Sequence, residues 1–489
     1  MSKFIDHSLF KMPTFYNKPA CSHKYLQTDV SPHASEAGFV RLPLAKRKAA
    51  ATRSARSTRG EDAGPDDSLT FPAPLVLPDD SLSIDPKEPP QSLLSWIRGG
   101  YRNPVTAERK TIYVAMAELD GDSGVGLQDQ ARYGAPGKLG HDLPHPKLDD
   151  VRGYLEAFYH PLPVKTFPRK ILIEKWEDAK SKTTTSKYVG LRFNEESRWR
   201  VRVRATPERK GLVNPLKHQL YINDIIDALI GSLPEDAYAI VLITHQDLYE
   251  DEDDDFCCGR AYGGSRVSVV STARYHPFYD AEDALDLDHR HMWPASHCAA
   301  IVKFLCGSDE PIEPPPPAKR RKGAGGEKVR GEEEGKQNSL IKADNSTPMG
   351  AALKTGGKIP RATSKADMYG LWFSRVARTV SHELGHCFGI GHCTYYACVM
   401  QGTAGLHEDA RQPPYLCPVC LAKVTEAAHE HVHKDTEEEV LVIERYKALS
   451  EFCKKWLHVG MFAGYRAWLG KRLEVLEAEH GEKVKEGKV

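Results

Sequence analysis

Hydrophobic and polar positions follow two different periods along residues 93–306, which predicts that strands and helices alternate there. Apolar residues recur at helical spacing in residues 148–159 and 220–233, which predicts two amphipathic helices. Short runs rich in β-branched residues predict strands at 110–116, within 164–176, at 237–244 and at 266–272. Elements in this order favour a layered α/β (α+β) domain.

Two stretches interrupt this pattern. Residues 1–92 combine a basic run of small residues at 45–59 with a Pro- and Asp-rich stretch, and residues 307–364 hold PPPP, KRRK and GEEEG runs. Such segments bury too little apolar surface to offset the entropy of ordering, so we expect a largely disordered tail and a disordered insertion. One catalytic domain is then expected at 93–306 and 365–478, with a charged tail at 479–489.

The charge balance and the N-terminal residues limit the partners and the location that we expect. The 489 residues hold 67 basic and 67 acidic side chains, so the net charge indicates no nucleic-acid partner. Residues 1–20 have no continuous apolar core, so no secretory signal is expected, and the run at 237–244 is too short to span a bilayer. We therefore expect a monomeric cytoplasmic protein, and the basic run at 45–59 keeps a nuclear location open.

A long helix is predicted at 367–387, and it carries two histidines four positions apart. Four residues turn an α-helix by about 400°, so His382 and His386 lie on one face, one turn apart. At that separation two imidazoles can bind one Zn²⁺ ion. Glu383 lies beside the metal but off the ligand face, where its carboxylate can reach a zinc-bound water.

The segment HELGHCFGIGH extends this motif to a third histidine. Gly389 can adopt positive φ and end the helix, so that the chain turns back and His392 supplies a third ligand. Three protein ligands leave the fourth position open to water, which distinguishes a catalytic zinc from a structural one. We expect a zinc-dependent peptidase that activates water, with Glu383 as general base and then as proton donor to the leaving amine.

Two pairs of cysteines follow the third histidine, and they predict a second metal site. Short spacing within each pair is typical of a tetrahedral thiolate site, which is closed to water and therefore structural. Two disulfides are the alternative, and a chain without an export signal disfavours them. We therefore expect two zinc ions per chain, one catalytic and one structural. The ligands of the structural ion would be Cys393, Cys398, Cys417 and Cys420.

The motif from His382 to Cys420 resembles the archaemetzincin branch of the metzincin metallopeptidases. The family pattern is HExxHxxGxxHC, four residues, CxM, about seventeen residues and CxxC, and here the last gap is one residue shorter. The segment VSVVSTAR at 267–274 also resembles the family. The resemblance implies a metzincin-like domain with a twisted mixed sheet, an active-site helix and a smaller lower subdomain that begins after Gly389. Met400 matches the family's Met-turn, a methionine packed beneath the zinc ligands.

The resemblance also implies how a substrate binds. Peptide substrates of such enzymes lie extended along a sheet edge, and the strand at 266–272 is a candidate near the cleft. Tyr395 or Tyr396 is a further candidate, for binding the oxyanion.

Other histidines and cysteines are weighed against the same chemistry. A second histidine-rich segment, DHRHMWPASHC, holds His289, His291, His297 and Cys298. These residues could form another metal site, but no helix or knuckle spacing links them, so we expect partly buried structural residues around Trp293.

Two other functions remain open at this level. A non-catalytic zinc-scaffolded binding protein would keep the metal ligands but would not need Glu383, whose presence favours the enzyme. Hydrolysis of a non-peptide amide would use the same zinc chemistry.

Overall fold

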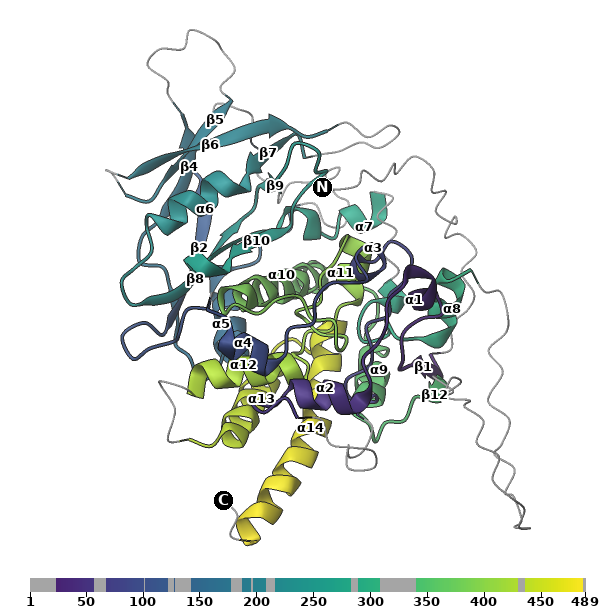
Figure 1. Ribbon diagram of the computed structural model, residues 1–489. Coiled ribbons are helices and arrows are strands. Elements are labelled where there is room, and N and C mark those ends of the chain that lie inside the picture. Colours follow the sequence, from purple (N-terminus) through teal and green to yellow (C-terminus); the bar gives the residue numbers. More distant parts are fainter. Residues whose placement is uncertain are drawn as a thin grey trace, which may run out of the picture.

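The computed structural model shows a large mixed sheet above a helical lower part (Figure 1). The structure describes residues 23–56, 67–100, 102–121, 127, 142–176, 187–194, 197–207, 216–282, 289–307, 340–429 and 436–486. Within these residues, no helix combines the length and the apolar character that a bilayer span requires.

The sheet contains ten strands, both parallel and antiparallel. Their bounds are β2 Thr111–Leu119, β3 Val164–Thr166, β4 Ile171–Lys175, β5 Tyr188–Arg192, β6 Arg198–Ala205, β7 His218–Tyr221, β8 Ala237–Thr244, β9 Asp247–Tyr249, β10 Gly259–Tyr262 and β11 Val267–Ser271. The order is β10-β11-β8-β2-β4-β5-β6-β7-β9, and β3 pairs with β2. The neighbours β11, β8 and β2 are parallel, whereas β10 is antiparallel to β11 and forms an edge of the sheet.

Helices cover both faces of the sheet and build the lower part (Figure 1). The helix α6 lies on one face, and α5 and α10 lie on the other. Below α10, the helices α12, α13 and α14 pack together. The bounds are α5 Leu148–Phe158, α6 Ile222–Ile230, α7 Tyr279–Glu282, α8 Ala299–Leu305, α10 Lys365–Cys387, α11 Leu406–Arg411, α12 Pro418–His429, α13 Glu438–Lys454 and α14 Gly460–Lys485.

The central strand β8 shows why its sequence is a continuous apolar run. Ile240 and Leu242 point into the core on the α6 side, whereas Val241 and Ile243 point into the core on the α10 side. All four side chains are fully buried. A strand buried on both faces has no polar position, as in parallel sheets covered by helices on both sides.

The helix α10 is fixed at its start and in its middle. At its start, Ser364 accepts a hydrogen bond from the backbone N–H of Asp367, whose carboxylate accepts one from the N–H of Ser364, which completes a capping box. In its middle, the Trp372 indole donates a 2.8 Å hydrogen bond to the carbonyl of Thr272, just after β11. The helix is therefore held against the sheet at a defined position.

Most predicted elements are confirmed. The strand at 237–244 and the helices at 148–159 and 367–387 match β8, α5 and α10, and the α/β (α+β) fold is as expected. The helix predicted at 220–233 begins only at Ile222, because the residues before it form β7. The strands β5 and β6 were not predicted; four of the residues of β6 are arginine and only Val201 is buried, so little apolar pattern marks it.

The described part of residues 1–92 differs from the disordered tail that we expected. It forms β1 Tyr25–Gln27, α1 His33–Ala37, α2 Leu44–Ala50 and α3 Ser81–Ile84, and α4 Leu93–Arg98 follows directly after it. Phe71 is buried and meets the rings of Tyr396, Tyr415 and Trp468 at centroid distances of 6.1, 5.7 and 5.5 Å. The segment builds only a small apolar cluster of its own, from Ala34, Phe39, Val76 and Leu82, and otherwise docks onto the catalytic domain.

The end of the expected insertion also differs. Within 307–364, residues 340–364 form β12 Leu340–Lys342, which pairs with β1, and α9 Pro348–Gly356, which packs against α14. Residues 308–339, which hold the PPPP, KRRK and GEEEG runs, lie outside the described residues. The charged tail expected at 479–489 instead continues α14 as far as Lys485.

Replacing Phe71 with alanine tests whether the N-terminal segment is part of the folded domain. Loss of a buried phenylalanine is expected to lower the free energy of unfolding by about 3–5 kcal/mol. Val40 in the same segment is 80 % exposed, so Val40→Ala is the control and should change the stability by less than about 0.5 kcal/mol. Urea denaturation measures both, and equal stability of the two variants would contradict the packing described above.

Candidate active site

Three histidine rings converge at the C-terminal end of α10. His382 and His386 lie one helical turn apart, and their Nε2 atoms are 3.0 Å from each other. The ring of His392, which follows the helix, lies 5.6 Å from that of His382 and 5.0 Å from that of His386 between centroids. One ligand atom from each ring can be chosen so that all three lie within 4.8 Å of one another.

The turn at Gly389 brings the third histidine back to the helix. Gly389 has φ 73°, and its N–H donates to the carbonyl of His386. The N–H of Ile390 donates to the carbonyl of Gly385, which completes a Schellman motif. A Cβ at position 389 would also lie 3.0 Å from the Cβ of Arg102, so both the backbone and the space favour glycine.

Each ring has its other nitrogen engaged by an acceptor. The Nδ1–H of His382 donates to the Val399 carbonyl and that of His386 donates to the Ile390 carbonyl, both at 2.7 Å. The Nδ1 of His392 is 3.0 Å from the Glu88 carboxylate. Because these oxygens only accept, Nδ1 carries the proton and Nε2 keeps its lone pair for a cation.

The electrostatic environment keeps the two helix imidazoles neutral. Burial, together with the neighbouring rings, holds the pKa of His382 well below its usual value. Burial and His392 lower the pKa of His386 to about 4. Neutral imidazole is the form that binds metals, so these two rings are in the ligand state at neutral pH.

The donor set fits zinc. With Zn–N bonds of 2.0–2.1 Å, tetrahedral ligand nitrogens are roughly 3.3 Å apart, which side-chain adjustment can reach from the observed positions. Three imidazoles with oriented Nδ1–H groups and an opening toward a cavity match the ligands of a catalytic rather than a structural ion.

The three histidines line a cavity of about 1560 Å³. Its wall includes Glu383, Tyr275 and Gly259–Ala261 of β10. The edge strand beside the histidines is therefore β10. The strand predicted at 266–272 is β11, which lies inside the sheet between β10 and β8.

Glu383 is buried beside the ligand face, where it packs against the backbone of β10. A Cβ on Gly259 would lie 2.8 Å from its Oε1, so this position leaves room only for glycine. Burial raises the pKa of Glu383 to about 8, although Arg260 opposes the shift. A cation held by the histidines would act in the same direction as Arg260 and favour the carboxylate.

Met400 lies beneath the histidines, as the family resemblance implies. Its side chain is fully buried and packs against Gly385, where any Cβ would collide with the Met400 sulfur. The Met400 carbonyl accepts a 2.7 Å hydrogen bond from the N–H of Cys393. The segment that carries His392 is thus joined to the Met400 turn.

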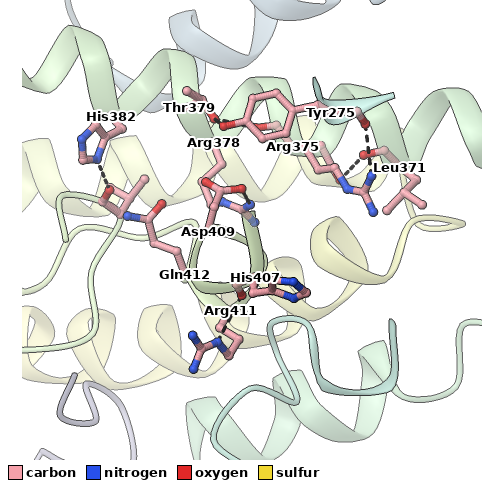
Figure 2. A network of polar contacts seen from close by, with 12 residues as sticks. Tyr275, Leu371, Arg375, Arg378, Thr379, His382, His407, Asp409, Arg411 and Gln412 are labelled. Carbon is pink, nitrogen blue, oxygen red and sulfur yellow. Dashed lines mark hydrogen bonds and ion pairs between the residues drawn. The ribbon is translucent and has the colours of Figure 1, made fainter. Parts of the chain in front are cut away.

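A buried polar network lies along α10 on the N-terminal side of His382 (Figure 2). Arg378 donates to Asp409 of α11 at 2.5 Å, and its side chain is 2 % exposed. The hydroxyl of Thr379 donates to that of Tyr275 at 2.8 Å, so Tyr275 is held at the cavity wall. Removing one member of such a buried pair leaves a charge without compensation, so the network fixes α11 relative to the histidines.

Four buried cysteine thiols gather next to His392. The possible ligand atoms of Cys393, Cys398, Cys417 and Cys420 lie within 4.8 Å of one another. The sulfurs of Cys393 and Cys417 are 3.5 Å apart, far more than the roughly 2.05 Å of a disulfide and close to the edge of a Zn–thiolate tetrahedron. All four are free thiols, so the disulfide alternative is not what the structure contains.

Some functional candidates were missed or misplaced from the sequence. Tyr395 and Tyr396 are buried away from the cavity, and Tyr396 lies under the guanidinium of Arg47 at 5.2 Å. Tyr275 lines the cavity instead, and Glu88 contacts His392 from the N-terminal segment. No local pattern marks either residue, because each reaches the site only through the fold.

Comparisons with known proteins point to one family. The model of peptidase family M54 matches residues 363–426, which span α10 and the four cysteines. Archaemetzincin-2 of Macaca fascicularis is 24 % identical over 386 residues, which cover 79 % of this chain and 75 % of that protein. Human archaemetzincin-1 is 34 % identical over 88 residues, 17 % of this chain and 18 % of that protein.

A solved structure with the same family name is also similar. The archaemetzincin of Methanopyrus kandleri is 16 % identical, covering 66 % of this chain and 96 % of that one, with a TM-score of 0.29, which is too low to support an argument about the fold. The family model covers the residues that carry the histidine and cysteine motifs, and the similarity to archaemetzincin-2 extends over most of the chain. By the family model and these relatives the chain is recognised as an archaemetzincin of peptidase family M54, a family of zinc-dependent metallopeptidases.

Proposed function

We propose that the protein hydrolyses peptide bonds at a zinc ion held by His382, His386 and His392, with Glu383 as general base. Membership of a metallopeptidase family makes peptides or proteins its substrates. One observation carries the assignment of residues: three imidazoles converge at the wall of a cavity directly beside a buried carboxyl group.

The roles of the side chains follow from their positions. A zinc ion, when bound, supplies Lewis acidity and makes water a nucleophile at neutral pH. Glu383 lies one residue after His382 on the same helix, so its carboxylate can take a proton from the attacking water and pass it to the leaving amine. Its burial keeps bulk water from competing for that proton.

The edge strand β10 supports a mode of substrate binding. Its residues Gly259–Ala261 line the cavity, and β10 is paired on one side only, with β11. An extended peptide can add to such an edge through main-chain hydrogen bonds. This arrangement would bring the scissile bond to the histidines without specific side-chain contacts.

A second zinc ion is proposed at Cys393, Cys398, Cys417 and Cys420. Four thiolates would fill the coordination sphere, so this ion would act by holding the chain together. Since Cys393 follows His392 directly, the site would fix the third catalytic ligand. We also propose that the protein acts as a monomer in the cytoplasm.

Replacing Glu383 with glutamine tests the general base. Glutamine keeps the shape but accepts no proton, so kcat for peptide hydrolysis is expected to fall by about 10²–10⁴-fold. The zinc content should be unchanged, because Glu383 is not a ligand. Glu451→Gln, at an exposed position on α13, is the control. Full activity of the Glu383 variant would exclude the proposed mechanism.

Replacing Cys417 with serine tests the structural ion. The zinc content is expected to fall by about one ion per chain, and the variant should unfold at lower urea concentration because metal binding is part of the folding free energy. Cys453→Ser buries the same hydroxyl in α13 outside the cluster and is the matched control. Elemental analysis measures the zinc content of the two variants, and equal zinc contents would argue against a zinc site at the four cysteines.

Replacing Glu88 with alanine tests whether the N-terminal segment orients His392. Loss of a carboxylate partner of a ligand histidine is expected to weaken zinc affinity by about 10–100-fold. The measurement is the free zinc concentration that gives half-maximal hydrolysis. Glu36→Ala, an exposed position in α1, serves as control and should leave this concentration unchanged. A Glu88 variant that behaves like the control would show that His392 is oriented without it.

A further inference from the structure

A third group of metal-binding side chains lies apart from the two sites above. His23, His291 and Cys298 offer ligand atoms that all lie within 4.8 Å of one another. The rings of His23 and His291 are 5.2 Å apart between centroids and nearly perpendicular, at 79°. His291 and Cys298 are 4 % and 2 % exposed, so the group is largely removed from solvent.

The backbone brings these residues together from two distant parts of the sequence. His23 precedes β1, and Leu26 in β1 forms a bridge with Cys298, the residue before α8. The N–H of Gln27 donates a 2.8 Å hydrogen bond to the carbonyl of His297. The three side chains therefore lie at the junction between the start of the N-terminal segment and the segment that leads into α8.

The neighbouring His297 shows what a structural histidine looks like in this region. Its Nε2 is 3.0 Å from the Ala73 carbonyl, and its Nδ1 is 3.1 Å from the Ser296 hydroxyl, so both ring nitrogens have partners. This agrees with the structural role that the sequence favoured for this segment. His291 faces the ring of His23, and the Cys298 sulfur lies close to both imidazoles.

His23 itself has features that packing does not explain. Its Nε2 is buried and makes no hydrogen bond to any described residue. Leaving a buried polar atom without a partner costs about 1–3 kcal/mol. The residue also has φ 52°, in the left-handed region that non-glycine residues rarely adopt. A metal ion would use the lone pair of the imidazole and stabilise this conformation.

We propose that His23, His291 and Cys298 bind a third zinc ion, which joins the N-terminal segment to the catalytic domain. Two imidazoles and a thiolate form a donor set that suits zinc. Tetrahedral zinc places such atoms roughly 3.3–3.8 Å apart, so the group needs only a small closure.

The position of this site gives it a structural role and a route for the ion. His23 borders a cavity of about 580 Å³ whose wall includes Arg290, Trp293 and Pro294, and none of the three catalytic histidines lines it. The described part of the N-terminal segment runs from His23 onward and includes Glu88, whose carboxylate contacts His392. A metal at its start would hold in place a segment that reaches the catalytic centre.

The test is the number of zinc ions bound per full-length chain, measured by elemental mass spectrometry after exhaustive dialysis. His23→Ala and Cys298→Ser are each expected to bind about one zinc ion fewer than the unchanged protein. Cys306→Ser is the matched control, because Cys306 ends the same helix that Cys298 begins and lies outside the group. The readout is a difference in bound metal, so it does not depend on peptidase activity or on the proposed function.

Zinc contents of His23→Ala and Cys298→Ser equal to that of Cys306→Ser would overturn the proposal. If Cys298→Ser does not fold, His23→Ala decides alone, since His23 lies at the start of the described chain and is only half-buried.

Discussion

The left-handed turn at Gly389 is the constraint on which the active site depends. Without it, α10 would carry His392 away from the two histidines that precede it, because a continuing helix would rotate it off their face. Side chains from elsewhere in the chain stabilise the turn, and the Gly389 carbonyl accepts a hydrogen bond from the side chain of Gln91. Lys423 of α12 in turn donates to the backbone carbonyl of Gln91 at 2.6 Å and to its side-chain carbonyl at 2.8 Å. Three distant parts of the chain therefore stabilise one backbone conformation.

Several independent contacts then remove the remaining freedom of the ligands. The carbonyls of Val399 and Ile390 and the carboxylate of Glu88 set the orientation of the three rings. Met400 supports the helix turn from below, and the four thiols hold the segment after His392. Oriented ligands bind a metal more tightly because less conformational entropy is lost when the ion binds. The site is in this sense largely built before the ion binds.

Site residues whose contacts depend on local spacing could be predicted from the sequence, whereas those that depend on the tertiary fold could not. The spacing in the sequence was enough to predict that His382 and His386, and likewise the four cysteines, lie close together. In a helix or a short turn, the number of residues between two positions fixes the distance between them. The positions of Glu88 and Tyr275 could not be predicted, because both residues are far from α10 in the sequence and approach it only in the folded protein. The prediction that residues 1–92 are largely disordered was wrong for their described part, and for a related reason. A segment such as that around Phe71 can be sparse in apolar residues and still be ordered, when another part of the chain supplies most of the surface that it buries.

The contact between Phe71 and Trp468 has a consequence for how the protein is made. Phe71 packs on α14, which the ribosome synthesises after both the N-terminal segment and the three histidines. Contacts between such distant positions carry a large loop-closure entropy and form slowly. A nascent chain would therefore hold Glu88 and the three histidines before the N-terminal segment can be fixed against α14, so docking of this segment would be a late step of folding.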